Sequence, residues 1–400
     1  MMEVRPSTVP HYFHSLNILR CIAAIAVVLF HWQKFFYPDD VFVPGGEKDT
    51  ALPLYSYLSF FYTYSSLSID IFFQLSGFIF FWLYSTQIAG GKTDFKKFAI
   101  YRLSRLYPLH LVALVSVVVL QLLMLQRMGH YFVIQYNDAY HFFLHLLFIQ
   151  NWGVEAGTSW NAPSWSTSVE ILMYILFFLI CRFKWHTNKS LLLLLMLAGA
   201  ALQHLGLLIG KGVFSFFLGG FLYYIFTYIL QQNENKKYLK ILGTLTIILW
   251  IPVITSHLYP IQERIWNYVN GSLRPHISPD QSAAQYEIVR NFLFRVTVAP
   301  CTILSVLLLE TVRGQFHRWW GVVGNCSYAF YLLHFPLQIA AVLILHQFHL
   351  DRNLLHSPWV MLLFLSVLSL MSLAVYYYFE RPAQDKIRQT AVPRKSVVAS

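Results

Sequence analysis

Residues 18–37, ILRCIAAIAVVLFHWQKFFY, form the first long apolar run of the chain, and this run decides the fold class. A helix that crosses the hydrocarbon core of a bilayer needs about 20 mostly apolar residues. The run meets that length, and more runs of the same kind follow it. We therefore predict a membrane-spanning helix that serves as a signal-anchor and is not cleaved.

The composition of the 400 residues agrees with this prediction, because 57% are hydrophobic, 18% aromatic and only 12% charged. That charged share is about half of the usual one in soluble proteins. A water-soluble fold cannot hide so much apolar surface, which excludes soluble, disordered, fibrous and disulfide-framework proteins. We expect an all-α, polytopic helical bundle in the inner (plasma) membrane.

Ten candidate spans follow from the same length criterion. The apolar segment 139–152 is shorter, and we interpret it as re-entrant or interfacial. We expect the longer outer loops at 38–56, 127–164 and 259–290. The spans lie near residues 18–37, 62–86, 106–126, 165–183, 190–209, 213–231, 241–258, 291–312, 325–347 and 359–379.

The basic residues predict the orientation of the bundle. Lys and Arg number 29 against 18 Asp and Glu, and 20 of the 29 basic residues lie at the two ends of the chain or in every second connection between spans. The positive-inside rule then places these connections and both termini in the cytoplasm. We divide the chain into a cytoplasmic segment 1–17, a transmembrane domain 18–382 and a basic tail 383–400 that we expect to be disordered. The absence of a basic stripe interleaved with aromatic residues argues against a nucleic-acid partner.

Metal ligation finds little support in the sequence. The four cysteines are scattered, and the histidine pairs 141/145 and 346/349 lack a third ligand at a defined spacing. We predict no metal site and no permanently bound cofactor, while a haem held between two helices stays an alternative.

Arg20 and His31 are the first ionisable residues at membrane depth. Eleven residues at about 100° each bring both side chains to one helix face, about 16 Å apart along the axis. Such groups are costly in a bilayer unless they face a cavity or a partner, so this face is a candidate polar path. In the alternative interpretation Arg20 reaches lipid phosphates and His31 bonds to a neighbouring helix.

Two carboxylates lie in other spans. Asp70 belongs to residues 68–78, SIDIFFQLSGF, and Glu170 ends residues 163–170, PSWSTSVE. We expect Glu170 near the level of His31, where a carboxylate raises the basicity of an imidazole and fixes its tautomer. The alternatives are a helix-packing role for Asp70 and helix capping for the serines and Glu170.

A pair of arginines, Arg102 and Arg105, precedes the third span. Residues three apart are neighbours on a helix surface, so the two guanidinium groups form a candidate clamp for the phosphates of a cytosolic donor. Ordinary positive-inside charge is the alternative.

Taken together, these residues resemble acyltransferase family 3, over about residues 12–385. Each motif alone is weak, but six occur in the family's order. They are Arg20 with His31, the stretch 68–78, Arg102 with Arg105, the WSTSVE of residues 165–170, the SYAFYLLHFP of residues 327–336, and the ERP of residues 380–382. Lys211 lies farther from Phe217 than in the family pattern, so we do not include it in the site. Gln74 replaces an apolar residue of that pattern.

The resemblance implies an O-acyltransferase that moves an acyl group, most often acetyl, from cytosolic acyl-CoA (acetyl-CoA) to a hydroxyl of a cell-surface or lipid-linked saccharide, such as a polysaccharide or lipopolysaccharide. His31 is then the expected general base, oriented by Glu170 or Asp70, while Arg20, Arg102 and Arg105 bind the donor. Glycan-assembly proteins of the cell envelope are expected partners.

Two other classes of protein fit parts of the sequence. A permease or exporter for a small anion would use the same buried charges as a relay. It agrees less well with a chain in which we find no internal repeat. A structural partner of a glycan-assembly complex leaves the spacing of Arg20 and His31 unexplained.

Overall fold

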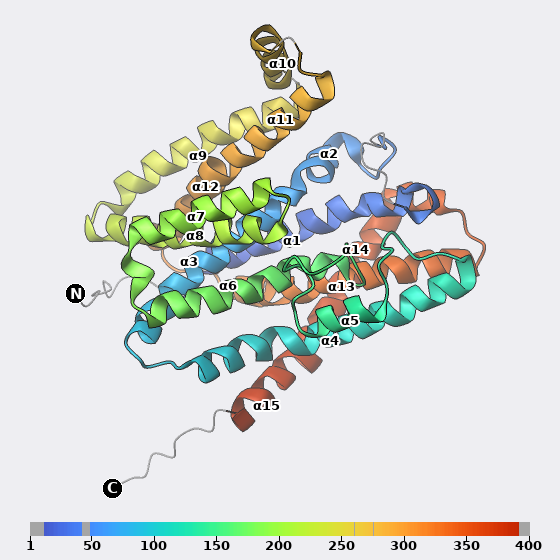
Figure 1. The fold of residues 1–400 in the computed structure, drawn as a ribbon, viewed down its shortest axis with the longest axis horizontal. Helices are drawn as coiled ribbons and strands as arrows, with labels where there is room; N and C mark the ends of the chain where they lie inside the picture. Colours follow the sequence, from blue (N-terminus) through green and yellow to red (C-terminus); the bar gives the residue numbers. More distant parts are fainter. Residues whose placement is uncertain (1–11, 42–48, 260, 275, 392–400) are drawn as a thin grey trace.

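The computed structural model describes residues 12–41, 49–259, 261–274 and 276–391. Within these ranges nine helical segments are long and apolar enough to cross a membrane, and the only β-pairing is an isolated bridge between Val41 and Val133. The prediction of an all-α, polytopic membrane bundle is therefore confirmed (Figure 1).

The first eight helices are α1 (His14–Trp32), α2 (Tyr55–Tyr64), α3 (Ser68–Ala89), α4 (Phe95–Met128), α5 (Ala139–Leu146), α6 (Trp165–Arg182), α7 (Lys189–His204) and α8 (Leu208–Gln231). The remaining seven are α9 (Asn235–Leu258), α10 (Ile261–Leu273), α11 (Pro279–Leu293), α12 (Ala299–Arg313), α13 (Trp319–Gln347), α14 (Pro358–Val375) and α15 (Arg381–Ala391).

The fifth predicted span, 190–209, is shorter than expected. Helix α7 has 16 residues, which at 1.5 Å per residue falls short of a hydrocarbon core about 30 Å thick. It packs along α8 instead. The segment 139–152 also contains a short helix, α5, of 8 residues. Neither is among the nine helices that have the length to span.

Two segments that we expected to lack regular structure are helical. The predicted loop 259–290 contains α10 and most of α11, and α10 stands away from the rest of the bundle (Figure 1). A capping box begins α11, because Ser278 and Gln281 each bond the other's backbone N–H. The tail prediction is wrong for residues 383–391, which belong to α15, and residues 392–400 lie outside the described residues.

Helix α1 lies at the centre of the bundle, between α3 and α13. Its first turn is fixed by Glu310 of α12, a fully buried carboxylate that accepts from the backbone N–H groups of His14 and Ser15 at 3.0 and 2.8 Å. A negative charge stabilises the positive end of the helix dipole. This contact sets the depth of α1 and therefore of every side chain along it.

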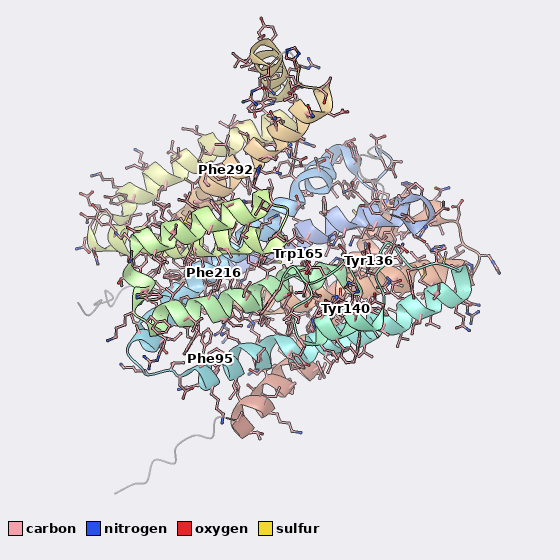
Figure 2. All side chains as sticks on the ribbon, viewed as in Figure 1. Phe95, Tyr136, Tyr140, Trp165, Phe216 and Phe292 are labelled. Atoms are coloured by element: carbon pink, nitrogen blue, oxygen red, sulfur yellow. The ribbon has the colours of Figure 1, made fainter. Side chains whose placement is uncertain are left out.

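Aromatic side chains fill the core on both sides of α1. Phe216 of α8 packs with rings of α3 and α6 in one cluster. Figure 2 labels this residue, and it also labels Phe95 at the start of α4. A second cluster joins α1 to α4, α13 and α14. Phe13, Leu16, Phe78 and Trp82 of the first cluster also line the larger of the cavities described next.

Candidate functional site

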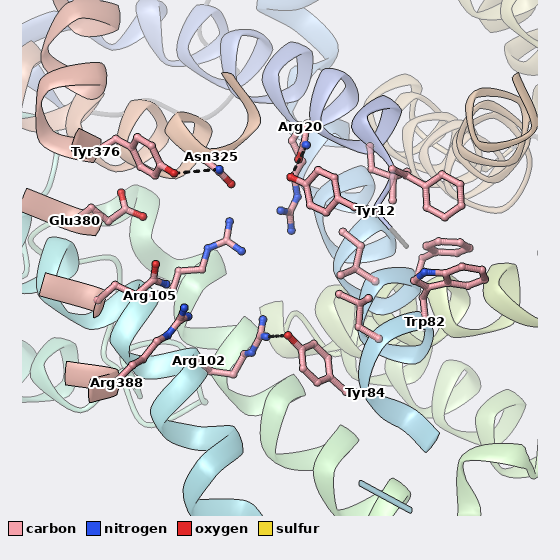
Figure 3. Close-up of a pocket in the computed structure, with 17 residues that line it drawn as sticks. Tyr12, Arg20, Trp82, Tyr84, Arg102, Arg105, Asn325, Tyr376, Glu380 and Arg388 are labelled. Atoms are coloured by element: carbon pink, nitrogen blue, oxygen red, sulfur yellow. Dashed lines mark hydrogen bonds between the residues drawn. The ribbon is translucent and has the colours of Figure 1, made fainter. Parts of the chain in front are cut away.

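A cavity of about 280 Å³ opens among α1, α3, α4, α13, α15 and the short π-helix Tyr376–Glu380. Four of the residues that line it are arginines: Arg20, Arg102, Arg105 and Arg388. We call it the arginine cavity. In Figure 3 the side chains of Arg20, Arg102 and Arg105 reach into the same space, and Arg388 lies beside Arg105. The structure thus brings together all three residues that the sequence predicted to bind the donor, and it adds a fourth arginine.

None of these four guanidinium groups forms an ion pair with a carboxylate of the described residues. Arg102 donates to the hydroxyl of Tyr84 and lies 4.8 Å from the centre of the Phe80 ring. Glu380, 3% exposed, also lines the cavity, yet one of its carboxylate oxygens has no hydrogen-bond partner within the described part of the chain. Four clustered cations against one acid favour a ligand with several negative charges.

A second, narrower cavity of about 100 Å³ continues from the first, since Arg20, Arg102 and Arg105 line both. We call it the glutamate cavity because Glu170 lies on its wall, where the carboxylate accepts a hydrogen bond from Ser76 at 2.8 Å. Tyr331 lines it as well. The linings of the two cavities together extend from α15 to the start of α6.

His31 has a partner that we did not predict. Its Nδ1 lies 2.7 Å from Nε2 of His334 on α13, and the two rings are stacked. The expectation that Glu170 or Asp70 bonds this imidazole is therefore wrong. Glu170 bonds Ser76 instead, and Asp70 is occupied by cations from other helices.

The hydrogen bonds of His334 fix the tautomer of His31. Nδ1 of His334 bonds the backbone carbonyl of Tyr331, which can only accept, so this nitrogen carries the proton. In the neutral pair Nε2 of His334 is then the acceptor, and His31 must donate through Nδ1. The lone pair of His31 is thus on Nε2. His31 stays partly exposed while His334 is fully buried.

Two hydrogen bonds connect the histidine pair to the glutamate cavity. The carbonyl that holds His334 belongs to Tyr331, whose hydroxyl lies 3.0 Å from the hydroxyl of Ser166. Both Tyr331 and Ser166 line the cavity. Lys34, one helical turn after His31, lies with its ammonium 4.7 Å from the centre of the Phe335 ring and acts electrostatically on both imidazoles.

The carboxylate of Asp70 is paired with two cations, which indicates a structural role. Arg295 approaches its carboxylate to 2.8 Å and Lys211 to 3.3 Å, while Ser215 donates to it at 2.8 Å. Lys211, which the sequence analysis left out of the site, is therefore a direct partner of Asp70. The cluster joins α3 to α8 and to the π-helix Phe294–Val298, and Asp70 is fully buried.

The histidines 141 and 145 have ordinary hydrogen-bond partners. His141 binds Asp138 through Nδ1 at 2.8 Å, and His145 lies 3.1 Å from the carbonyl of Ser159. Burial lowers the pKa of His145 to about 3, so this imidazole is neutral at physiological pH.

Sequence reasoning missed His334, Lys34 and Arg388 as members of this region. His334 was present in a quoted motif, but its distance to His31 depends on the packing of α1 against α13. Lys34 and Arg388 looked like ordinary charges at a membrane boundary. A cation one helical turn from His31 was the one signal available in advance.

The fold and the cavities define a class, a multi-pass membrane protein that contains a cavity lined by four arginines and a hydrogen-bonded imidazole pair. Residues 13–380 match the family model described as an acyltransferase domain, that of acyltransferase family 3. Because this match covers nearly the whole chain, the protein belongs to that family and is a membrane acyltransferase. Comparisons with curated proteins and with solved structures found no match.

Proposed function

We propose that this acyltransferase moves an acyl group, most often acetyl, from acyl-CoA to a hydroxyl of a saccharide on the other side of the inner membrane. The observation that carries the proposal is the arginine cavity, in which four guanidinium groups without a described carboxylate partner lie in one space. Coenzyme A carries phosphates at one end and a thioester at the other, which suits a cavity that is basic at its mouth and narrow beyond it.

In this proposal Arg20, Arg102 and Arg105 bind the phosphates of the donor from the cytoplasmic side. Guanidinium groups bind phosphates through charge-assisted, often bidentate hydrogen bonds. The pantetheine arm then extends into the glutamate cavity, past Glu170, toward Tyr331 and the histidine pair. The basic connections at this end of the bundle support a cytoplasmic mouth.

The proposed chemistry uses the lone pair on Nε2 of His31. This nitrogen takes the proton of the acceptor hydroxyl while the hydroxyl oxygen attacks the carbonyl carbon of the thioester. The carbon–sulfur bond breaks, and the departing thiolate of coenzyme A takes up the proton from His31. His334 holds the imidazole in the reactive tautomer, and Lys34 supplies a positive charge beside the developing oxyanion.

The acceptor is proposed to be a cell-surface or lipid-linked saccharide, since the family resemblance points to extracytoplasmic sugars. A direct test compares the surface glycans of cells with and without the gene by mass spectrometry. The proposal expects glycan species that are heavier by one acyl group only when the gene is present. Identical glycan masses in both strains, with the protein expressed, would contradict it.

A permease for a small anion is the second candidate, because the same arginine cavity suits an anion in transit. It predicts flux of the anion through vesicles without release of free coenzyme A. Release of the thiol that depends on acceptor distinguishes the acyltransferase.

A further inference from the structure

The last helix, α15, contributes a wall to the arginine cavity. It begins at Arg381, just beyond residues 13–380 that match the family model. Gln384 and Arg388 of this helix line the cavity, and α15 packs along α4. The donor site of this chain therefore extends past the family domain.

Two hydrogen bonds to α4 hold the side chain of Arg388 in place. Its Nε donates to the hydroxyl of Ser104 and its Nη2 to the carbonyl of Tyr101, each at 3.1 Å. The guanidinium also lies 4.9 Å from the centre of the Tyr101 ring. For Nη1 no partner is found in the described part of the chain, and this leaves it available to a ligand in the cavity.

This position places a third positive charge close to Arg102 and Arg105, both of which interact electrostatically with Arg388. Clustered like charges repel one another at short range, and the cluster contains no described carboxylate partner for Arg388. An anion between these groups removes the repulsion. Arg20, Arg102 and Arg105 line both cavities, whereas Arg388 lines only the arginine cavity. Of the four arginines it is thus the one that does not share a cavity with Glu170.

We propose that Arg388 binds the 3′-phosphate on the ribose of coenzyme A, the phosphate that lies outside the diphosphate chain leading to the thioester. The inference rests on the proposed function, because it assumes that acyl-CoA is the donor. It names a specificity determinant that distinguishes coenzyme A from its 3′-dephospho form. One charge-assisted hydrogen bond corresponds to about a tenfold to hundredfold difference in Kd.

The test measures the Kd of coenzyme A and of 3′-dephospho-coenzyme A for the full-length protein in detergent. The wild type should bind coenzyme A at least about tenfold more tightly than the dephospho form. Arg388→Ala should remove this preference, and Arg388→Lys should keep part of it. Lys386→Ala is the matched control, because Lys386 is an exposed cation two residues earlier on α15 and does not line the cavity.

The outcomes separate the two proposals. A wild type that binds neither compound contradicts acyl-CoA as the donor. A wild type that prefers coenzyme A, with an Arg388→Ala variant that keeps the same preference, overturns only the role of Arg388. Equal weakening of both compounds by Arg388→Ala also overturns it, since the arginine then contacts another part of the ligand or only supports α15. If Arg388→Ala does not fold, a preference in Arg388→Lys equal to that of the wild type overturns the proposed hydrogen bond from Nη1 of Arg388.

Discussion

At the scale of single residues, the bond between His31 and His334 matters most for the proposed chemistry. Sequence reasoning found His31 and assigned it the role of general base, but it chose a carboxylate as the orienting group. The error has a physical cause, because helical periodicity gives the face of a side chain and not the helix that packs against it. An imidazole whose other nitrogen is fixed by a backbone carbonyl orients His31 without adding a charge.

We predict that His334→Met lowers kcat for acyl transfer about a hundredfold, since methionine fills the space but accepts hydrogen bonds poorly. His334→Gln keeps an oxygen that can accept from Nδ1 of His31, so it should retain about ten times more activity than the methionine variant. Initial rates on the purified enzyme measure both, with unchanged coenzyme A binding as the check of folding. Equal losses in the two variants would show that His334 only fills space.

Asp70 is the residue whose interpretation changes most between sequence and structure. Removing it leaves the buried Arg295 and the partly exposed Lys211 without their counterion, and Asp70→Ala should destabilise the protein by about 3–5 kcal/mol. The double variant Asp70→Leu/Arg295→Met should lose less stability than Asp70→Leu alone, because only the partly exposed Lys211 then lacks its counterion. Thermal unfolding in detergent measures these differences. Additive losses in the double variant would rule out a coupled charge cluster.

His145 makes the stability depend on pH in a defined window. Its pKa is about 3 in the folded protein against its usual 6.5, so only the unfolded chain takes up a proton between these values. The free energy of unfolding should therefore fall as pH drops from about 6.5 toward 3, by up to about 1.4 kcal/mol per pH unit. Measured as unfolding temperature against pH, the His145→Gln variant should show a weaker dependence. The same slope in both proteins would contradict a buried neutral imidazole.

At the scale of helices, sequence reasoning located nearly every element. Nine spans could be predicted from runs of apolar residues, because a helix that crosses lipid requires about 20 such residues, whichever helix it packs against. Prediction from the sequence failed for α10, α11 and α15, because their polar compositions resemble those of loops. These helices depend on local capping, as at Ser278, and on contacts with other helices, as between Arg388 and α4.

The crossing of α3 and α8 depends on a glycine. A Cβ atom at Gly77 would overlap the backbone carbonyl of Phe216, so the two helices approach as closely as their backbones allow. Gly77→Ala should separate them and cost about 1–3 kcal/mol. Gly243→Ala is the matched control, because a Cβ atom on this glycine of α9 meets open space. Thermal unfolding compares the two, and an equal effect of both substitutions would contradict a close crossing.

At the scale of the whole molecule, the sequence predicted the bundle and singled out Arg20, Arg102 and Arg105, while the cavity that these three residues share required the structure. Charge at a membrane boundary looks the same in sequence whether it faces lipid phosphates or a cavity. Packing alone decides that Arg20 of α1 and Arg105 of α4 line one space. The arginine cavity and the glutamate cavity share Arg20, Arg102 and Arg105 in their walls, and together their linings extend from α15 to Glu170.

We propose above all that an acyl group enters through the arginine cavity and leaves by way of His31. Vesicles that contain the purified protein in one orientation test it, with acetyl-CoA supplied on the Arg102 side and a saccharide acceptor enclosed on the His31 side. We predict acetylated acceptor with the wild type, and at most about a hundredth of that rate with His31→Gln. Equal acetylation by His31→Gln, or acetylation only when the donor is on the His31 side, would contradict the account.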